Sequence, residues 1–314
     1  MLVLRTPRIL LRWFTADDAA FIVELLNDPG WKKFIGERGV HNEEDARAWI
    51  ADRLIASCWD QGFGLWAMQR TEDGELLGMC GLVQRDFLPG IDVGYALLPR
   101  FRGMGYVREA VGACLDYSNE VLGVERVLAI TRTGKAASVR VLQSLDFSLE
   151  RTERLADNDY ESMLFAWRAP SDEPGADRPS SDARREIDAL VSRFYGAFGN
   201  TVGHTHHVAA LPYYFVPGAR IHRVGGDGFA SHELRGFIKP RAELLDSGRL
   251  MGFSESEIDH RTCIEGRLAQ RWSHYRKSGQ MDGQPFEGRG SKLMQFIRAP
   301  KGWKICDLAW EDHA

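Results

Sequence analysis

The sequence is poor in cysteine, contains no long apolar run and has no excess of positive charge. Its five cysteines are isolated from one another and form no C-x-x-C pair, so neither a disulfide framework nor a zinc site is expected. No segment approaches the ~18 consecutive apolar residues that a membrane-spanning helix needs, and Arg5 and Pro7 come too early for a secretion signal. We therefore expect a cytoplasmic protein that does not enter a membrane.

The charge balance excludes a further class of partner. The 40 Lys and Arg residues are outnumbered by 44 Asp and Glu residues, which gives no sign of the broad basic surface typical of nucleic-acid binding. At 314 residues the chain is long for one hydrophobic core, so two domains are expected. Residues 169–184 contain three prolines and almost no apolar side chain, as is typical of a linker. The predicted domains are residues 1–168 and 182–314, with a linker over 169–181.

Strand and helix signals alternate along the first half. A capping box at Thr15–Asp18 predicts a helix start, Pro29-Gly30 is expected to end that helix, and Asn42 with Asp45 caps the next one. Later a helix crosses between strands, which favours a mixed α/β sheet with a parallel portion. The expected strands are residues 4–14, 65–70, 75–84 and 126–131 with further strand-like residues to 167, and a short helix ends at 145.

Residues 92–110 organise this half, because they read as an apolar strand, a cationic glycine turn and then a helix to about Leu122. Glycine at 103 and 105 lets backbone N–H groups approach an anion closely, and the first turn of the helix adds its positive dipole end. The turn lacks the Gly-Lys-Ser/Thr of a Walker loop, and Arg108 occupies the third glycine position of a dinucleotide fingerprint. An anion cradle of another class is predicted.

The turn Arg100–Gly105 resembles the R/Q-x-x-G-x-G/A motif of the GNAT acetyltransferase superfamily, in particular its RimJ/RimL type. Further similarity lies in residues 6–12, 17–18, 74–82, 92–95 and 137–142, so that the resemblance spans about residues 1–168. It implies acetyl-CoA as cofactor, with the amides of 102–106 on the pyrophosphate and the strand 95–98 along the pantetheine arm. The cofactor-binding residues that it implies are Tyr95, Leu97, Leu98, Arg100, Arg102, Gly103, Met104, Gly105, Tyr106 and Ser138.

The resemblance also implies the reaction, in which a primary amine of a small molecule or peptide attacks the thioester directly, without a metal. Asp92 is the candidate base, and Glu75, Asp86 and Glu161 are other candidates. The alternative interpretation of each is an ordinary exposed or salt-bridged carboxylate. Three positions depart from the family pattern: Lys135 replaces a frequent asparagine, Leu142 a tyrosine acid, and Asp146 a glycine. These departures leave open a second interpretation, an acyl-CoA-binding regulatory protein without efficient turnover.

The second half begins with an amphipathic helix from Arg184, whose apolar residues include Ile187, Leu190 and Phe194. Alternation then predicts an antiparallel sheet covered by helices on one face. The expected strands are 213–224, 257–275, 292–298 and 303–311, with a helical segment at 232–245.

This half resembles the SnoaL-like and nuclear-transport-factor-2-like families, which implies a cone-shaped curved sheet packed on helices. The overall class is thus α/β and α+β in two domains. The resemblance implies a pocket for substrate or ligand binding, a dimer contact, or a second activity such as an isomerase, hydratase or cyclase. His204, His206 and His207 lack supporting ligands and are not expected to bind metal. The pocket candidates are Tyr214, His222, Arg223, Trp272, His274, Tyr275 and Trp310.

Overall fold

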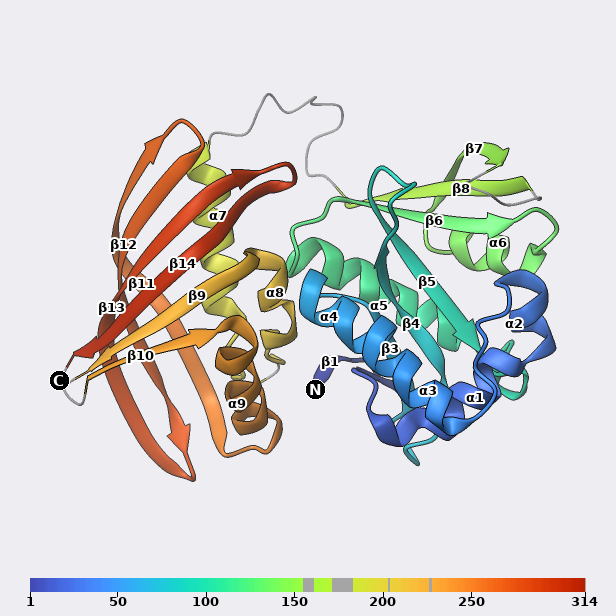
Figure 1. Cartoon of the computed structure of the whole chain (residues 1–314), viewed down its shortest axis with the longest axis horizontal. Coiled ribbons are helices and arrows are strands. Elements are labelled where there is room, and N and C mark those ends of the chain that lie inside the picture. Colours follow the sequence, from blue (N-terminus) through green and yellow to red (C-terminus); the bar gives the residue numbers. More distant parts are fainter. Residues whose placement is uncertain (155–160, 171–182, 203, 226–227, 314) are drawn as a thin grey trace. The chain divides into compact units, whose positions relative to one another are not determined.

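The computed structural model describes residues 1–154, 161–170, 183–202, 204–225 and 228–313 (Figure 1). The chain divides into two compact units, residues 2–172 and residues 173–314. From residue 171 onward the expected linker lies outside the described residues, so its boundaries stay predictions. No helix in the described ranges is long and apolar enough to cross a membrane.

The first unit is built on an eight-stranded mixed sheet in the order β1-β2-β3-β4-β5-β6-β8-β7. Neighbouring strands are antiparallel except β5 and β6, which confirms the expected mixed sheet. The expected strand 4–14 is wrong in detail, because Thr6 turns the chain back and its N–H donates to the Ile9 carbonyl at 2.8 Å. The strands are β1 (Leu2–Arg5), β2 (Ile9–Arg12), β3 (Leu65–Arg70), β4 (Leu76–Gln84), β5 (Ile91–Leu97), β6 (Arg126–Arg132), β7 (Ser148–Arg154) and β8 (Glu161–Arg168).

The helices of this unit begin largely where the capping signals predicted. Thr15 donates its N–H to the Asp18 carboxylate at 2.8 Å, and the Asn42 side chain accepts from Asp45 at 3.0 Å. Pro29 does not simply end a helix but opens the next one at its first position, where a missing N–H costs nothing. The helical segments are η1 (Ala16–Asp18), α1 (Ala19–Asn27), α2 (Pro29–Phe34), α3 (Glu43–Trp49), η2 (Ile50–Ile55), α4 (Ala56–Gln61), η3 (Pro99–Phe101), α5 (Tyr106–Glu120) and α6 (Ala136–Gln143).

Helix α5 packs on strands β4 and β5 and buries the apolar face that its sequence predicted. Ala110, Val111 and Cys114 on this face are completely excluded from solvent. At about 25 cal/mol per Å² of apolar surface, burial of such a face stabilises the unit by several kcal/mol. The helix is thereby fixed with its N-terminus next to the end of β5, which sets the position of the glycine turn.

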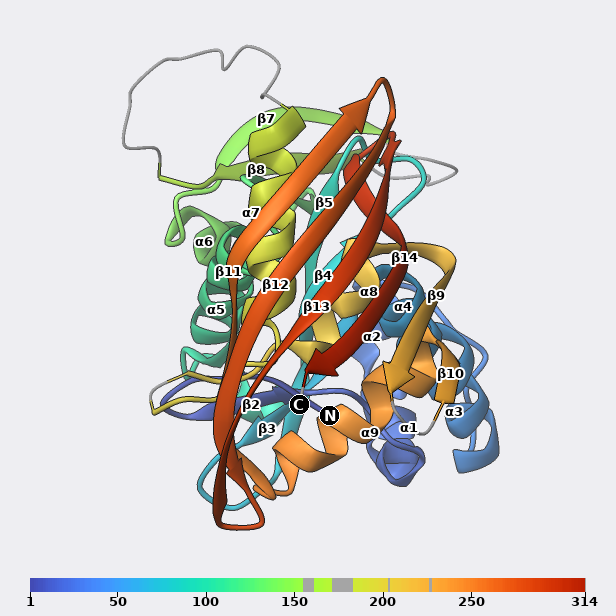
Figure 2. The same cartoon turned by 90° about the vertical axis from the view of Figure 1, so that its left-hand side faces the viewer.

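The second unit is a six-stranded sheet in the order β10-β9-β14-β13-β12-β11, antiparallel except for the parallel pair β14 and β9. Figure 2 shows its long strands curving beside helix α7, which contacts β11 and β14; α9 contacts β9, β10 and β11. The expected strand 257–275 is two strands, because Gly266 adopts a positive φ of 56° and turns the chain into a hairpin. The elements are α7 (Ala183–Gly196), η4 (Val208–Ala210), α8 (Leu211–Tyr214), β9 (Phe215–Gly225), β10 (Gly228–Glu233), α9 (Leu234–Asp246), β11 (Leu250–Glu265), β12 (Leu268–Met281), β13 (Gln284–Ala299) and β14 (Gly302–His313).

Candidate active site

Strands β5 and β6 are paired at a single position, Asp92 with Leu128, and diverge beyond it. The second half of β5 therefore has a neighbouring strand on one side only, β4. A parallel pair that stops after one residue leaves the backbone groups on that side of β5 without a strand partner. The gap between the two strands is the feature on which the site is built.

The register of β4 shows which β5 groups face the gap. Leu98 donates its N–H to the Leu77 carbonyl on the β4 side at 3.0 Å, whereas Leu82 of β4 donates away from β5 to Gly64. Hydrogen-bonded and non-bonded pairs alternate in an antiparallel ladder, so the N–H groups of Tyr95 and Leu97 point to the opposite side, into the gap. They form a ready edge for an extended ligand.

A cavity of about 680 Å³ extends along this edge to the glycine turn, and we call it the cofactor-side cavity. Gly103 and Gly105 have φ angles of 79° and 81°, a conformation that favours glycine, and a Cβ at Gly103 would meet only open space. The turn leads directly into α5, whose first N–H groups have no acceptor within the helix. Donors and the helix dipole thus face one side of the cavity, as a phosphate site requires.

The arginines of the turn have different surroundings. Arg102 lines the cavity and is held by Asp28 at 2.7 Å and by the Leu97 carbonyl at 3.0 Å. Arg100 points elsewhere, because it pairs with Glu24 and, at 3.6 Å from Nε, with Glu75. It is not among the residues that line the cavity.

Seven of the ten expected cofactor-binding residues line this cavity, and three do not. Leu98 is buried beside β4, Arg100 is occupied by carboxylates, and Met104 is half exposed, with its carbonyl accepting from Arg8 at 3.1 Å. The residues that the structure brings together are Tyr95, Leu97, Arg102, Gly103, Gly105, Tyr106 and Ser138.

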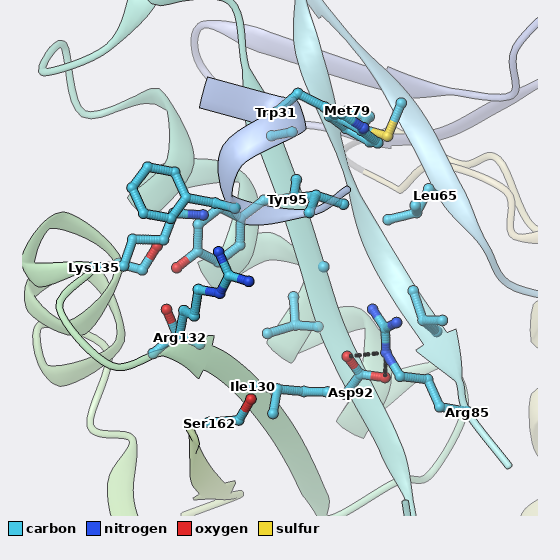
Figure 3. Close-up of a pocket in the computed structure, with 18 of the residues that line it drawn as sticks. Trp31, Leu65, Met79, Arg85, Asp92, Tyr95, Ile130, Arg132, Lys135 and Ser162 are labelled. Carbon is cyan, nitrogen blue, oxygen red and sulfur yellow. Dashed lines mark hydrogen bonds and ion pairs between the residues drawn. The ribbon is translucent and has the colours of Figure 1, made fainter. Parts of the chain in front are cut away.

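Figure 3 shows residues that line a second cavity of about 680 Å³, which we call the acceptor-side cavity. Tyr95, Ala96, Lys135 and Ser138 line both, so the two cavities meet beside β5. The walls of the second cavity include residues of β4, β5, β6, α2, α3 and η2. Several of its side chains are aromatic: Trp31, Phe34, Trp49 and Phe87. This arrangement can hold two ligands whose reacting ends meet near Tyr95.

Asp92 lies in the acceptor-side cavity with an exposed fraction of only 1%. Both of its carboxylate oxygens lie 3.1 Å from Arg85 Nε, as the dashed lines in Figure 3 mark. Burial raises the pKa of this carboxyl to about 6, and Arg85 opposes that rise. The carboxylate is thus ionised at neutral pH yet basic enough to accept a proton.

The other carboxylates considered from the sequence lie elsewhere. Glu75 pairs with Arg70 at 2.6 Å at the end of a hairpin, and Asp86 and Glu161 are exposed; none of the three lines either cavity. Leu142 is buried in α6 and also lines neither cavity.

Hydroxyl and amine groups near Tyr95 were not singled out as catalytic from the sequence. Burial raises the pKa of the Tyr95 phenol to about 12, partly offset by a hydrogen bond with Ser138. Burial and the nearby Arg102 lower the pKa of Lys135, whose Nζ lies 5.4 Å from the centre of the Phe34 ring. Thr131 has a buried hydroxyl with no hydrogen-bond partner among the described residues. Two features of the sequence could have indicated these groups: the predicted strand ends at residue 131, and Lys135 departs from the family pattern.

Comparison with known proteins decides the family of this unit. The profile of the Acetyltransferase (GNAT) domain matches residues 8–148. The uncharacterized protein YkkB of Bacillus subtilis is 31% identical over 158 residues, which cover 48% of this chain and 87% of that protein. This chain belongs to the GNAT acetyltransferase family. Acetyl-CoA, the cofactor expected from the sequence, is the one that GNAT acetyltransferases use.

Two further proteins are similar to the GNAT unit. The uncharacterized N-acetyltransferase YoaA of B. subtilis is 26% identical over 152 residues, which cover 47% of this chain and 84% of that protein. The structure of the ribosomal-protein-S5-alanine acetyltransferase of Vibrio fischeri aligns with a TM-score of 0.47 and 16% identity, over 55% of this chain and all of that chain.

The unit that follows the GNAT unit has its own cavity, of about 380 Å³. Of the seven expected pocket residues, Arg223, Tyr275 and Trp310 line it. Tyr214 is buried in α8, and His222 pairs with Asp307 at 3.2 Å and stacks on Phe229. Neither of these two lines the cavity.

Trp272 and His274 also lie outside that cavity. Side chains alternate across β12: Arg271, Ser273 and Tyr275 are buried, whereas Trp272 is half exposed and His274 bonds the Ser291 hydroxyl at 2.9 Å on the exposed face. Trp272 and His274 therefore point away from the buried face that carries Tyr275.

Of the three histidines at 204–207, His204 is exposed, whereas His206 and His207 are packed in the unit. His206 is buried and pairs with Asp246 at 3.0 Å, and burial lowers the pKa of His207 to about 4. In the described ranges no three His, Cys, Asp or Glu residues are grouped as metal ligands.

Proposed function

We propose that the first unit transfers an acetyl group from acetyl-CoA to a primary amine, by direct attack within a ternary complex. The observation that carries this proposal is the pair of cavities that meet beside β5, one leading to the glycine turn and the other containing Asp92. Holding two reactants with their reacting ends together is itself a large part of such catalysis, because it removes the entropy cost of their encounter.

The residues of the cofactor-side cavity fit acetyl-CoA. The positive φ angles at Gly103 and Gly105 and the free N–H groups of α5 suit a pyrophosphate, and Arg102 adds a positive charge. The N–H groups of Tyr95 and Leu97 suit an extended arm that carries amides. When bound, the cofactor supplies an activated acetyl thioester whose carbonyl one of these N–H groups can polarise.

Asp92 is the group that we assign to accept the proton from the attacking amine. A primary amine, whose unperturbed pKa is about 10, must lose a proton to complete the transfer. The Asp92 carboxylate, buried in the acceptor-side cavity, is placed to accept that proton. Arg85 holds both carboxylate oxygens and so fixes their orientation. The hydroxyl of Tyr95 stays protonated near neutral pH and can donate a hydrogen bond where the cavities meet.

The charges around the acceptor-side cavity favour an amine that also carries an anionic group. Five cationic side chains line it, against the carboxylates of Glu37 and Asp92. A polyamine or an aminoglycoside would meet repulsion there, whereas an amino acid, a peptide terminus with a nearby acid or a phosphorylated amine would be attracted. The cations are Arg38, Arg53, Arg85, Arg132 and Lys135.

A thiol-release assay on the full chain tests this proposal. Acetyl-CoA is supplied with four sets of amines: amino acids, acidic peptides, polyamines and aminoglycosides. Turnover with anionic amines supports the proposal, and turnover confined to polyamines would overturn the charge argument. If calorimetry detects no acetyl-CoA binding at millimolar concentration, acetyl transfer itself is excluded. Binding without turnover by any amine would favour the second interpretation, a regulatory acyl-CoA-binding protein.

We also propose a SnoaL-like or nuclear-transport-factor-2-like fold for residues 182–314, with a role in ligand binding or in a homodimer contact. The curved sheet, the single parallel pair β14 with β9 and the helices against it support this proposal. An isomerase, hydratase or cyclase activity is the third interpretation. Sedimentation of the full chain tests the dimer, since a monomer at micromolar concentration would exclude it.

A further inference from the structure

The cavity of the second unit is lined by aromatic side chains from both the helices and the sheet. Its lining comes from α7, α9 and all strands of the sheet except β10, so the cavity lies between the helices and the curved sheet. At about 380 Å³ it falls at the lower end of the range typical of small-molecule sites. The aromatic lining residues are Phe194, Phe198, Phe237, Phe253, Tyr275, Phe286 and Trp310.

Both carboxylates of the cavity already have cationic partners. Glu255 accepts from Lys292 Nζ at 2.6 Å, and Asp312 pairs with Lys277. Asp312 also accepts the Tyr275 hydroxyl at 2.6 Å. Two lysines and two carboxylates thus balance, and neither acid is left to neutralise a further cation.

Two guanidinium groups, those of Arg241 and Arg223, also line the cavity. Arg241 lies against aromatic rings, with Cζ 3.6 Å from the centre of Phe237 and 5.5 Å from that of Trp310. It donates to the Phe237 carbonyl at 2.9 Å. Among the described residues, no carboxylate oxygen lies within 4.0 Å of either guanidinium. Arg241 is half-buried and Arg223 is exposed. A partly buried positive charge without an acid partner, such as that of Arg241, is costly unless an anion joins it.

The pKa of Arg241 is consistent with a positive charge that lacks a carboxylate partner. Burial lowers its pKa to about 10, and the charge of Arg223 lowers it further, while Glu255 and Asp312 act in the opposite direction. Arg241 therefore remains charged at neutral pH and is repelled by the charge of Arg223, which lines the same cavity. An anion bound between the two guanidinium groups would offset the cost of burying the charge of Arg241 and would reduce the repulsion between Arg241 and Arg223.

We propose that this cavity binds a small aromatic carboxylate, with its ring among the phenylalanine and tryptophan side chains and its carboxylate on Arg241 and Arg223. A guanidinium is well suited to a carboxylate because its planar donors match the two oxygens. The aromatic lining selects a flat apolar body rather than a sugar or a bare phosphate. This site goes beyond acetyl transfer and does not depend on it.

Isothermal titration of the full chain with benzoate, trans-cinnamate and indole-3-acetate tests the proposal. We expect at least one of these to bind, and its uncharged amide to bind at least ~10-fold more weakly, since the amide loses the charge-assisted contact. Arg241→Gln is expected to weaken binding by a similar factor. Arg223→Gln, at an exposed position, is expected to weaken it several-fold with no risk to folding.

Lys239→Gln is the matched control, because Lys239 is an exposed cation on the same helix and does not line the cavity. It is expected to leave binding unchanged. Equal binding of acid and amide, unchanged binding by the Arg223 variant, or no binding of any of the three acids at millimolar concentration would each overturn the proposal. The acetyl-CoA affinity of the same variants should equal that of the wild type, which separates this outcome from any failure of acetyl transfer.

Discussion

Replacement of Asp92 by asparagine should separate the activity of this protein from its stability. Asparagine has nearly the same shape but cannot accept the proton of the amine, so kcat/KM should fall by roughly 100-fold or more, the usual contribution of a general base. In the wild type, kcat/KM should rise with pH through about 6, as the buried carboxyl ionises. That rise should be absent from the variant.

The effect on stability should have the opposite sign. The folded pKa of Asp92 is about 6, above its ordinary value of 3.8, so the folded protein binds the proton more tightly than the unfolded chain does. The stability of the wild type should therefore fall as pH rises from about 4 to about 6, by up to about 3 kcal/mol. Asp92→Asn lacks this loss, so at pH 8 it should be more stable than the wild type while being nearly inactive.

Urea denaturation at pH 4.5 and pH 8, with the thiol-release assay on the same samples, measures both effects. Asp86→Asn is the matched control, because Asp86 is exposed and lines neither cavity. It should change neither rate nor stability. If Asp92→Asn keeps the wild-type rate, Asp92 is not the base. If it is less stable than the wild type at pH 8, the Arg85 contact outweighs the cost of burial and the energetic reasoning fails.

Three further predictions concern the glycine turn and the second unit. Gly105→Val should weaken acetyl-CoA binding by about 10-fold in calorimetry, because a branched side chain at a φ of 81° costs more than ~1 kcal/mol and would move the turn. Arg102→Gln should also weaken acetyl-CoA binding, whereas Arg100→Gln should not, because of these two arginines Arg102 alone lines the cofactor-side cavity; equal effects of the two substitutions would contradict this assignment. Glu255→Gln should destabilise the second unit by about 3 kcal/mol in urea, since it leaves the buried Lys292 without its partner; an unchanged midpoint would show that Lys292 simply loses its proton.

The arginines of the glycine turn show how far local sequence can specify a site. The turn itself was predictable, because glycines between an apolar strand and an amphipathic helix have few other uses. The difference between Arg100 and Arg102 was not. It depends on Glu24 and Asp28, acids from the α1–α2 region more than 70 residues earlier in the chain. No property of the turn indicates which arginine they occupy.

Strand β12 illustrates a different limit. Alternation alone separates Trp272 and His274 from Tyr275, since neighbouring residues of a strand point to opposite faces. What the pattern did not reveal is which face is buried. Arg271 lies on the buried face at 2% exposure because Glu257 and Asp188 pair with it, and a charged residue is ordinarily placed outside. From the sequence, residues of both faces, Trp272 and His274 together with Tyr275, were expected in one pocket, which the alternation of a strand does not allow.

The acceptor-side cavity arises from the absence of an interaction. Strands β5 and β6 read as ordinary apolar strands, and nothing in either indicates that they pair only at Asp92 and Leu128. Their divergence opens the gap, frees the N–H groups of Tyr95 and Leu97, and lets Lys135 line the same space as Asp92. Each of these residues is locally unremarkable in its own element. Their chemistry depends on a long-range geometry that a periodic pattern does not encode. The family resemblance implied the cofactor motif and Asp92, whereas the arrangement of Tyr95, Thr131 and Lys135 around the same space was not visible in the sequence.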